Sequence, residues 1–362
     1  MIGRYSKIAV MHSDYVVRGG AERKSLIYAA MLRNRAEVEI ICGNFSAEHT
    51  FSEYIGDTPI RSFPYKGPIQ KLISLLRMAW AVRGFDLLIV NNYPSNLSAA
   101  LAKWAFRKPV IWFCNEAQLH LVHAPKKGRW ALAVLKFLEK RAVSSFEIVI
   151  ANSGYTAGEI RRIYAKTARV IYSGLDLKRF PDHEPSSSKT KTLILVSRIE
   201  PHKQIDTALR LFESIRSSYA ECQLIIVGSG SALAAYQAMA GPGVSFTGAV
   251  LEAEKLSLLS RADLFIFPTL NEPLGVTPLE AMAAGLPVVA FKSGGVSETV
   301  INGETGFLVE DEAEFVAKSL LLIRDALLCS TMRSRAMRHV RESSFSQECM
   351  VAELVKEIER LS

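Results

Sequence analysis

Two glutamates placed eight positions apart, Glu272 and Glu280, could bind the hydroxyl groups of a sugar or a ribose. Carboxylates accept hydrogen bonds from such hydroxyls, and the free backbone amides of Gly275, Val276 and Thr277 at a helix start suit a phosphate. One loop could therefore hold a whole nucleotide sugar. The helix dipole alone also favours a glutamate near a helix start, so this pair by itself does not establish a site.

Two cations near a second helix start, Arg198 and Lys203, suit a more highly charged anion. They lie on either side of a turn before a helix that we predict over 205–217, and helix N-termini already favour anions. This arrangement fits a diphosphate, and two solvated charges in a surface loop are the alternative. A later Gly-x-Gly, at Gly228 and Gly230, lacks the third glycine of a dinucleotide-binding fingerprint.

The segments around these residues alternate between predicted strands and predicted helices. Apolar runs over 264–267 and 287–290 enclose the loop of Glu272 and the helix after it. The same alternation begins with a strand over 7–12 and continues through one over 110–114. We therefore predict an α/β fold with doubly wound parallel sheets, in which ligands bind where loops leave the carboxyl ends of the strands.

An ordered series of motifs resembles the donor-binding half of the family 4 retaining glycosyltransferases, which have the GT-B fold. The series comprises 262–269, Glu272 to Glu280, 281–289, Gly294-Gly295 with Glu298, and 303–309. The resemblance spans nearly the whole chain and is strongest over 198–309. It implies two Rossmann-like domains that face a central cleft, with a nucleotide sugar as the donor substrate. The sequence has no Asp-x-Asp metal signature, and the cations Arg198 and Lys203 make a metal unnecessary, so we expect neither a metal ion nor another cofactor.

The resemblance also assigns roles to the residues named above. Arg198 and Lys203 match the arginine and lysine that hold the donor diphosphate in this family. Glu280 would then hold the ribose hydroxyls and Glu272 the hydroxyls of the transferred sugar, assisted by the amides at the start of the helix.

A loop near the N-terminus, Arg18-Gly19-Gly20, resembles the first loop of the family. Paired glycines there let the backbone approach a ligand without an intervening side chain. We therefore place Gly19 and Gly20 with the donor and Arg18 on the acceptor side.

The chain departs from the family directly after the predicted strand over 110–114. Many members have a histidine there that faces the reacting sugar, whereas this chain has Asn115. Asparagine can donate a hydrogen bond but cannot exchange a proton near neutral pH. Asn115 therefore remains a catalytic candidate that orients the sugar, and Glu116, His120 and His123 are further candidates on the acceptor side.

A change of composition marks the domain boundary. Residues 1–180 hold 27 Lys and Arg against 13 Asp and Glu, and residues 181–362 hold 17 against 23. The segment 181–189 between them is polar and contains two prolines. We expect an acceptor-binding domain over 1–175 and a nucleotide-sugar-binding domain over 176–345. By resemblance, a last helix over 346–362 packs back on the first domain.

The basic first half suggests an anionic neighbour. No recognised nucleic-acid motif is present, so we expect no nucleic-acid partner. The segment 65–83 sets Lys71, Arg77 and Arg83 among apolar residues, as in a helix that lies on a membrane surface. An ordinary amphipathic helix packed on a sheet is the alternative. Five scattered cysteines, without a metal-binding spacing, and the lack of an apolar span predict a cytoplasmic protein, with contact at the inner face of the plasma membrane as a further hypothesis.

The resemblance implies sugar transfer with retention of configuration. We expect a front-face attack, in which Arg198 and Lys203 neutralise the charge that builds on the leaving diphosphate. The segment 112–116 resembles that of mannosyltransferases in the family, so our first hypothesis is transfer of mannose from GDP-mannose. The acceptor would be a glycan or a lipid-linked molecule in polysaccharide or glycoconjugate biosynthesis. A sugar-nucleotide epimerase and a catalytically inactive nucleotide-sugar binder are the alternatives.

Overall fold

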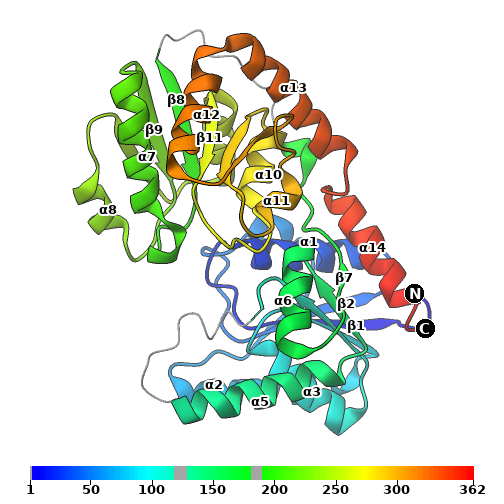
Figure 1. Ribbon diagram of the computed structural model, residues 1–362. Coiled ribbons are helices and arrows are strands. Elements are labelled where there is room, and N and C mark those ends of the chain that lie inside the picture. Colours follow the sequence, from blue (N-terminus) through cyan, green and yellow to red (C-terminus); the bar gives the residue numbers. More distant parts are fainter. Residues whose placement is uncertain (1, 118–128, 181–189) are drawn as a thin grey trace. The chain divides into compact units, whose positions relative to one another are not determined.

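The computed structural model describes residues 2–117, 129–180 and 190–362 (Figure 1). These residues form two compact units. Unit 1 comprises Met1–Gly174 and Gln347–Ser362, and unit 2 comprises Leu175–Ser346. Each unit is built around one sheet, and the described strands of both sheets pair in parallel.

The sheet of unit 1 has seven strands in the order β3-β2-β1-β4-β5-β6-β7. The strands are β1 (Lys7–His12), β2 (Glu37–Cys42), β3 (Ile60–Ser62), β4 (Leu87–Val90), β5 (Val110–Cys114), β6 (Ile148–Ala151) and β7 (Arg169–Val170). The strand order reverses between β1 and β4. The connections that follow these two neighbours therefore diverge, which leaves room for a ligand at their carboxyl ends.

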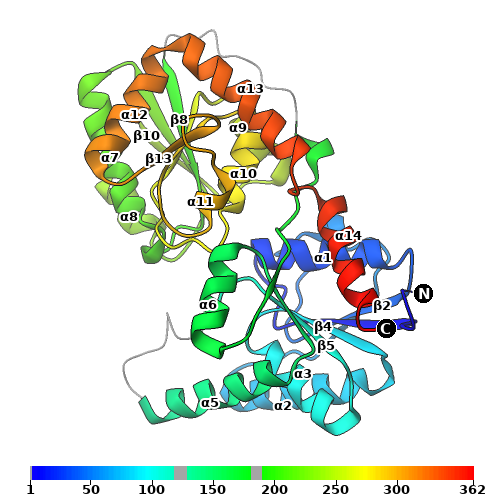
Figure 2. The same cartoon turned by 45° about the vertical axis from the view of Figure 1, so that its right-hand side comes forward.

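Helices cover both faces of this sheet (Figure 2). They are α1 (Gly20–Leu32), α2 (Pro68–Ala81), α3 (Ser95–Phe106), α5 (Arg129–Ser145), α6 (Gly154–Tyr164) and α14 (Gln347–Glu359). On one face, Leu26 of α1 shares a core with Leu354 and Ile358 of α14. On the other face, Met78 of α2 and Ala100 of α3 lie in a second core. The end of the chain thus completes the core of its first half.

The sheet of unit 2 has six strands in the order β10-β9-β8-β11-β12-β13. The strands are β8 (Lys191–Val196), β9 (Cys222–Val227), β10 (Val244–Gly248), β11 (Leu264–Phe267), β12 (Val288–Phe291) and β13 (Gly306–Val309). The helices are α7 (Ile205–Ser218), α8 (Leu233–Met239), α9 (Glu252–Arg261), α10 (Val276–Ala283), α11 (Val296–Thr299), α12 (Glu312–Arg324) and α13 (Ala326–Glu342). Here the order reverses between β8 and β11.

The central strands explain why the apolar runs of the sequence predict this fold. All residues of β5, β11 and β12 are buried, because a parallel sheet with helices on both faces leaves neither face to solvent. The predicted α/β fold with two doubly wound parallel sheets is confirmed. Among the described residues, no helix combines the length and the apolar character needed to cross a bilayer.

Candidate functional site

The loop after β8 is held in place by two glycines of the next strand's loop. Gly228 has a φ of +137°, and a Cβ atom there would lie 1.9 Å from the carbonyl oxygen of Ser197. A Cβ atom on Gly230 would lie 2.3 Å from the carbonyl oxygen of Ile199. The backbone amide of Ile199 also donates to the carbonyl of Ser229 at 2.9 Å. The Gly-x-Gly therefore makes room for the loop that carries Arg198.

Arg198 and Lys203 lie in different surroundings within this loop. The Arg198 side chain is exposed, and its guanidinium forms no hydrogen bond or ion pair with any residue that the structure describes. Lys203 ends a 3-10 turn, Pro201–Lys203, and its side chain is only 14% exposed. Gln204 follows in the left-handed conformation, with a φ of 55°, and α7 begins at the next residue. Arg198 is thus open to a ligand, whereas Lys203 is partly enclosed.

The loop after β11 packs on the loop that carries Lys203. The Thr269 hydroxyl donates to the Lys203 carbonyl at 3.1 Å, and the Leu270 amide donates to Oε1 of Gln204 at 2.7 Å. Lys203 Nζ lies 2.7 Å from Oε2 of Glu272. These loops meet because β8 and β11 are neighbours at the point where the strand order reverses. The structure therefore brings Lys203 and Glu272 together.

A glycine fixes the backbone of the Glu272 loop from the other side. Gly294 has a φ of +65°, and a Cβ atom there would lie 2.5 Å from the Glu272 carbonyl oxygen. The amide of Gly295 donates to that same carbonyl at 2.8 Å. Gly275 then caps α10, so the amides of Val276 and Thr277 lie in its first turn, as the phosphate hypothesis requires.

Glu280 lies deeper in unit 2 than the other candidates, with an exposed fraction of 2%. Nζ of Lys255, on α9, lies 3.0 Å from each of its carboxylate oxygens and 3.0 Å from Oε2 of Glu252. A buried carboxylate needs such a partner. The sequence analysis missed Lys255, although the Glu252/Lys255 spacing on one helix face was a usable signal. Two carboxylates thus share this one ammonium.

The first loop of unit 1 carries Arg18, Gly19 and Gly20 after β1. Gly19 is the N-cap of α1, and Gly20 is the first residue of that helix. The Arg18 guanidinium lies 2.7 Å from Oε1 of Glu53 and 4.7 Å from the ring centre of Phe51. The structure thus places Arg18 against the short 3-10 segment Ser52–Tyr54, with its side chain partly exposed.

Asn115, directly after β5, is held by two side chains that the sequence analysis did not identify. Its backbone amide and Nδ2 donate to Oδ1 of Asn92 at 3.0 Å and 3.1 Å. Its Oδ1 accepts a hydrogen bond from Nζ of Lys24, which lies 3.2 Å from the ring centre of Phe113. Burial lowers the pKa of Lys24 well below its ordinary value. Asn92 follows β4, at the reversal of strand order, so the rule for parallel sheets could have found it.

The remaining acceptor-side candidates are placed only in part. Glu116 follows Asn115 and is partly buried. His120 and His123 lie outside the described residues.

His12, at the end of β1, is expected to make the folded protein less stable at acidic pH. Burial lowers its pKa from 6.5 to about 4, against the opposing charge of Asp14 and with a smaller contribution from Lys24. Between these two values the unfolded chain binds a proton that the folded chain does not, so stability falls as pH drops from 6.5 to 4. The loss from this group is about 3 kcal/mol. Denaturant unfolding at several pH values should show it.

A His12→Gln variant serves as the comparison, because it cannot titrate in this range. The buried Glu139 contributes in the opposite direction: burial raises its pKa to about 7, and its contribution to stability falls as pH rises from 4.5 to 7. The difference between wild type and His12→Gln cancels that contribution. Parallel stability curves for the two proteins would contradict the assignment to His12.

Both halves of the chain match models of one family of enzymes. Residues 18–179 match Glycosyltransferase Family 4, and residues 178–339 match Glycosyl transferases group 1. The chain belongs to the family 4 glycosyltransferases. The expected family and the expected enzyme class, a retaining hexosyltransferase, are therefore confirmed.

Relatives of this family 4 glycosyltransferase include two mannosyltransferases. The human alpha-1,3/1,6-mannosyltransferase ALG2 is 24% identical, over 98% of this chain and 96% of its own length. A GDP-mannose-dependent alpha-(1-6)-phosphatidylinositol monomannoside mannosyltransferase of Mycobacterium tuberculosis is 31% identical, over 56% of this chain and 60% of its own length.

Solved structures resemble this glycosyltransferase over nearly its whole length. Anabaena HepE in complex with UDP-glucose superposes with a TM-score of 0.80 at 20% identity, and the match covers 98% of this chain and 99% of that one. At this identity the likeness concerns the fold, and it agrees with the predicted GT-B architecture.

Proposed function

We propose that this glycosyltransferase moves mannose from GDP-mannose to a lipid-linked glycan acceptor, with retention of configuration. The observation that carries the proposal is the contact between Lys203 and Glu272, at the reversal of strand order in unit 2, with the exposed Arg198 on the same loop as Lys203. This arrangement offers cations to a diphosphate and a carboxylate to sugar hydroxyls.

The roles proposed for the donor site follow from charge. Arg198 and Lys203 offset the negative charge that develops on the leaving diphosphate, while Glu272 orients the transferred sugar. Glu280, held by Lys255, accepts hydrogen bonds from the ribose hydroxyls. In a front-face attack, the bond from the sugar to the diphosphate breaks as the acceptor oxygen bonds to the same face. The acceptor's proton passes to the leaving phosphate oxygen.

The choice of mannose and of a lipid-linked acceptor rests on the relatives. Two of them are named as mannosyltransferases, and one of these is named for GDP-mannose and a phosphatidylinositol monomannoside. In our proposal unit 2 binds the donor. Unit 1 serves the acceptor through Arg18 and Glu116, and its Asn115 orients the transferred sugar. The enzyme works at the cytoplasmic face of a membrane.

A donor screen by thermal shift tests the proposal. GDP-mannose, GDP-glucose, UDP-glucose and UDP-galactose are compared, each with its free nucleoside diphosphate. A ligand at 100 times its Kd stabilises the native state by about 2.7 kcal/mol, so GDP-mannose should raise the Tm by roughly 5–10 °C. A larger shift with UDP-glucose, the ligand of the HepE complex, would reject GDP-mannose.

The two alternatives are separated by following product with and without acceptor. The proposed transferase forms a mannosylated product only when membrane lipid extract or a lipid-linked glycan is added. An epimerase would change the sugar nucleotide without any acceptor. A catalytically inactive binder would show the thermal shift and no turnover.

A further inference from the structure

Three helices on one face of unit 1 expose large apolar side chains to solvent. On α2 these are Ile69, Leu72, Ile73, Leu76 and Trp80, with exposed fractions from 49% to 76%. Trp104 on α3 is 53% exposed and Phe137 on α5 is 63% exposed. Figures 1 and 2 both show α2, α3 and α5 side by side. The apolar side chains thus belong to one continuous helical layer.

The exposed apolar side chains of α2 do not lie on the face that packs against the core. Ser74, Met78 and Ala79 form the buried face of α2, and Met78 and Ala79 lie in the core beneath it. Leu72, Leu76 and Trp80 lie outside this buried face, and no described residue buries them. A surface helix of a globular protein usually carries polar residues on that side. The outer side of α2 is therefore apolar without a partner in the described chain.

The charges on this helical layer have one sign. Neither α2 nor α3 contains Asp or Glu, and the one acidic residue of α5, Glu139, is 2% exposed. The cations include Lys71 and Arg77 on α2 and the exposed Lys136 and Lys140 on α5. Apolar side chains among cations complement a bilayer that contains anionic lipid.

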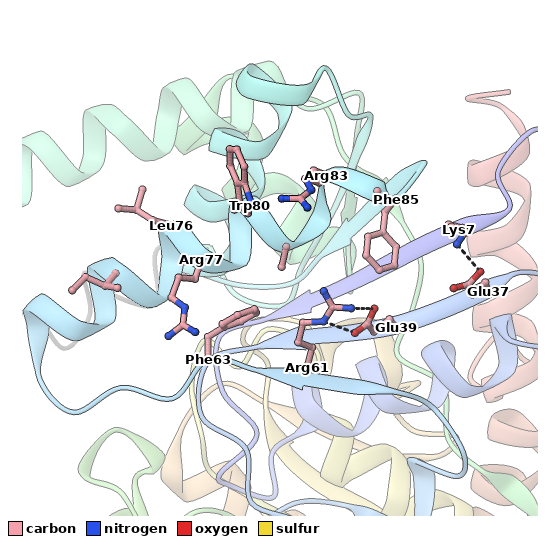
Figure 3. Close-up of a pocket in the computed structure, with 13 residues that line it drawn as sticks. Lys7, Glu37, Glu39, Arg61, Phe63, Leu76, Arg77, Trp80, Arg83 and Phe85 are labelled. Carbon is pink, nitrogen blue, oxygen red and sulfur yellow. Dashed lines mark hydrogen bonds and ion pairs between the residues drawn. The ribbon is translucent and has the colours of Figure 1, made fainter.

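A pocket of about 720 Å³ lies beside α2 and contains two guanidinium groups suited to lipid phosphates (Figure 3). Arg61 in this pocket is neutralised by Glu39, at 2.8 Å and 3.0 Å. Arg77 and Arg83 form no ion pair with a described residue, and each lies over an aromatic ring, at 5.2 Å and 5.3 Å from the ring centres. None of the residues that line the pocket belongs to the donor-site loops of unit 2.

We propose that α2, α3 and α5 form a surface that docks on an anionic phospholipid bilayer, with Arg77 and Arg83 bound to lipid phosphates at its edge. The inference deepens the proposed function, because it identifies the surface that meets the membrane of a lipid-linked acceptor. Membrane binding itself requires neither donor nor acceptor, so it can be tested when the donor is unknown.

Sedimentation with vesicles tests the surface. The full chain should bind vesicles of phosphatidylcholine and phosphatidylglycerol in equal parts, bind vesicles of phosphatidylcholine alone weakly, and lose affinity as salt rises. The Arg77→Gln/Arg83→Gln variant should bind the anionic vesicles roughly 30-fold more weakly, since each cation near such a surface contributes about a fivefold factor. The Leu72→Ser/Leu76→Ser variant should also lose binding.

A matched control has the same change of charge in unit 2. Arg210→Gln/Lys292→Gln alters two exposed cations that belong to unit 2 and to none of these three helices, and it should bind vesicles like wild type. An equal loss in the control would mean that only net charge matters, and would overturn the proposal. Absence of vesicle binding, or a salt-independent equal affinity for both vesicles, would also overturn it. Concentration-dependent dimerisation that Leu72→Ser/Leu76→Ser abolishes, without vesicle binding, would assign the surface to a second copy of the chain.

Tryptophan fluorescence gives an independent measure of the geometry. The fluorescence emission of Trp80 and Trp104 should shift to shorter wavelength when anionic vesicles are added. Lipids brominated in their acyl chains should quench this emission. In a Trp130→Phe background, which removes the tryptophan of α5, the Trp80→Phe/Trp104→Phe variant should lose this response while it still sediments with the vesicles, because Phe keeps the apolar contact. A response that persists in this variant would contradict the docked face. Thermal unfolding of each variant checks that it is folded.

Discussion

Replacing Lys203 or Arg198 by alanine is expected to lower kcat/KM by about 100-fold or more. In the proposed reaction each of these cations offsets charge on the leaving diphosphate, and the loss of one preorganised electrostatic contact costs roughly 2.7–4 kcal/mol in the transition state. Initial rates at several donor concentrations measure the effect. Because Arg198 is exposed and unpaired among the described residues, its loss should act on catalysis with little change of Tm.

The Lys203 variant differs from the Arg198 variant in one respect. Lys203 also contacts Glu272 at 2.7 Å, so Lys203→Ala leaves that carboxylate without its cation, next to the proposed diphosphate site. A Lys203→Ala/Glu272→Gln double variant should therefore lose less activity than the sum of the two single changes predicts. Arg210→Ala, an exposed arginine on α7, is the control and should keep full activity. Turnover near that of wild type in both Arg198→Ala and Lys203→Ala would refute the diphosphate site.

Replacing Asn115 by alanine is expected to lower kcat about tenfold while the KM for the donor changes little. In the proposed front-face reaction the asparagine amide orients the sugar, and Arg198, Lys203 and Glu280 still hold the nucleotide. One hydrogen bond of this kind contributes about 1 kcal/mol. Asn115→His should preserve part of the activity, because an imidazole can also donate. Steady-state kinetics with varied donor separates kcat from KM.

Lys24 enters this prediction as a positioning residue, because it donates to Oδ1 of Asn115. Lys24→Met keeps the length and fills the buried site, but it removes one of the two side-chain contacts that hold the asparagine amide. We expect a loss of kcat similar to that of Asn115→Ala, and little further loss in the double variant. Additive losses, or a fall in Tm without any change in kcat, would mean that Lys24 only supports the fold. Full activity in Asn115→Ala would remove this loop from the reaction.

The sequence predicted the strands and helices well, because each depends on the pattern of residues within one short segment. The strands expected over 110–114 and 264–267 are β5 and β11, and their unbroken apolar runs reflect burial on both faces of a parallel sheet. The helix expected over 205–217 is α7, one residue longer. The loops between these elements carry the donor-site candidates, and the roles expected for those candidates came from the resemblance to the family.

The partners of these candidates could not be predicted, because they come from distant parts of the chain. Lys203 and Glu272 are 69 positions apart, Lys255 and Glu280 are 25 apart, and Lys24 and Asn115 are 91 apart. Only the order of strands in the two sheets brings such pairs together. The Gly228 turn shows the same limit, since its sequence identifies a tight turn but not the loop that packs against it. The outward apolar side of α2 also required the structure, because most positions of that helix are apolar.

The place of α14 in the core of unit 1 bears on how the protein is made in the cell. The first 174 residues leave the ribosome without α14, which together with α1 covers one face of their sheet. Translation then takes roughly 10 to 35 s to supply the 172 residues of unit 2, at about 5–20 residues per second. During that time the side chains that later pack on Leu354 and Ile358, including Leu26, have no cover from α14. Unit 2 can complete its fold first although it is made second, because unit 1 cannot complete its core until α14 has been synthesised. Nascent chains that still lack α14 therefore expose an apolar surface of unit 1 that chaperones can bind.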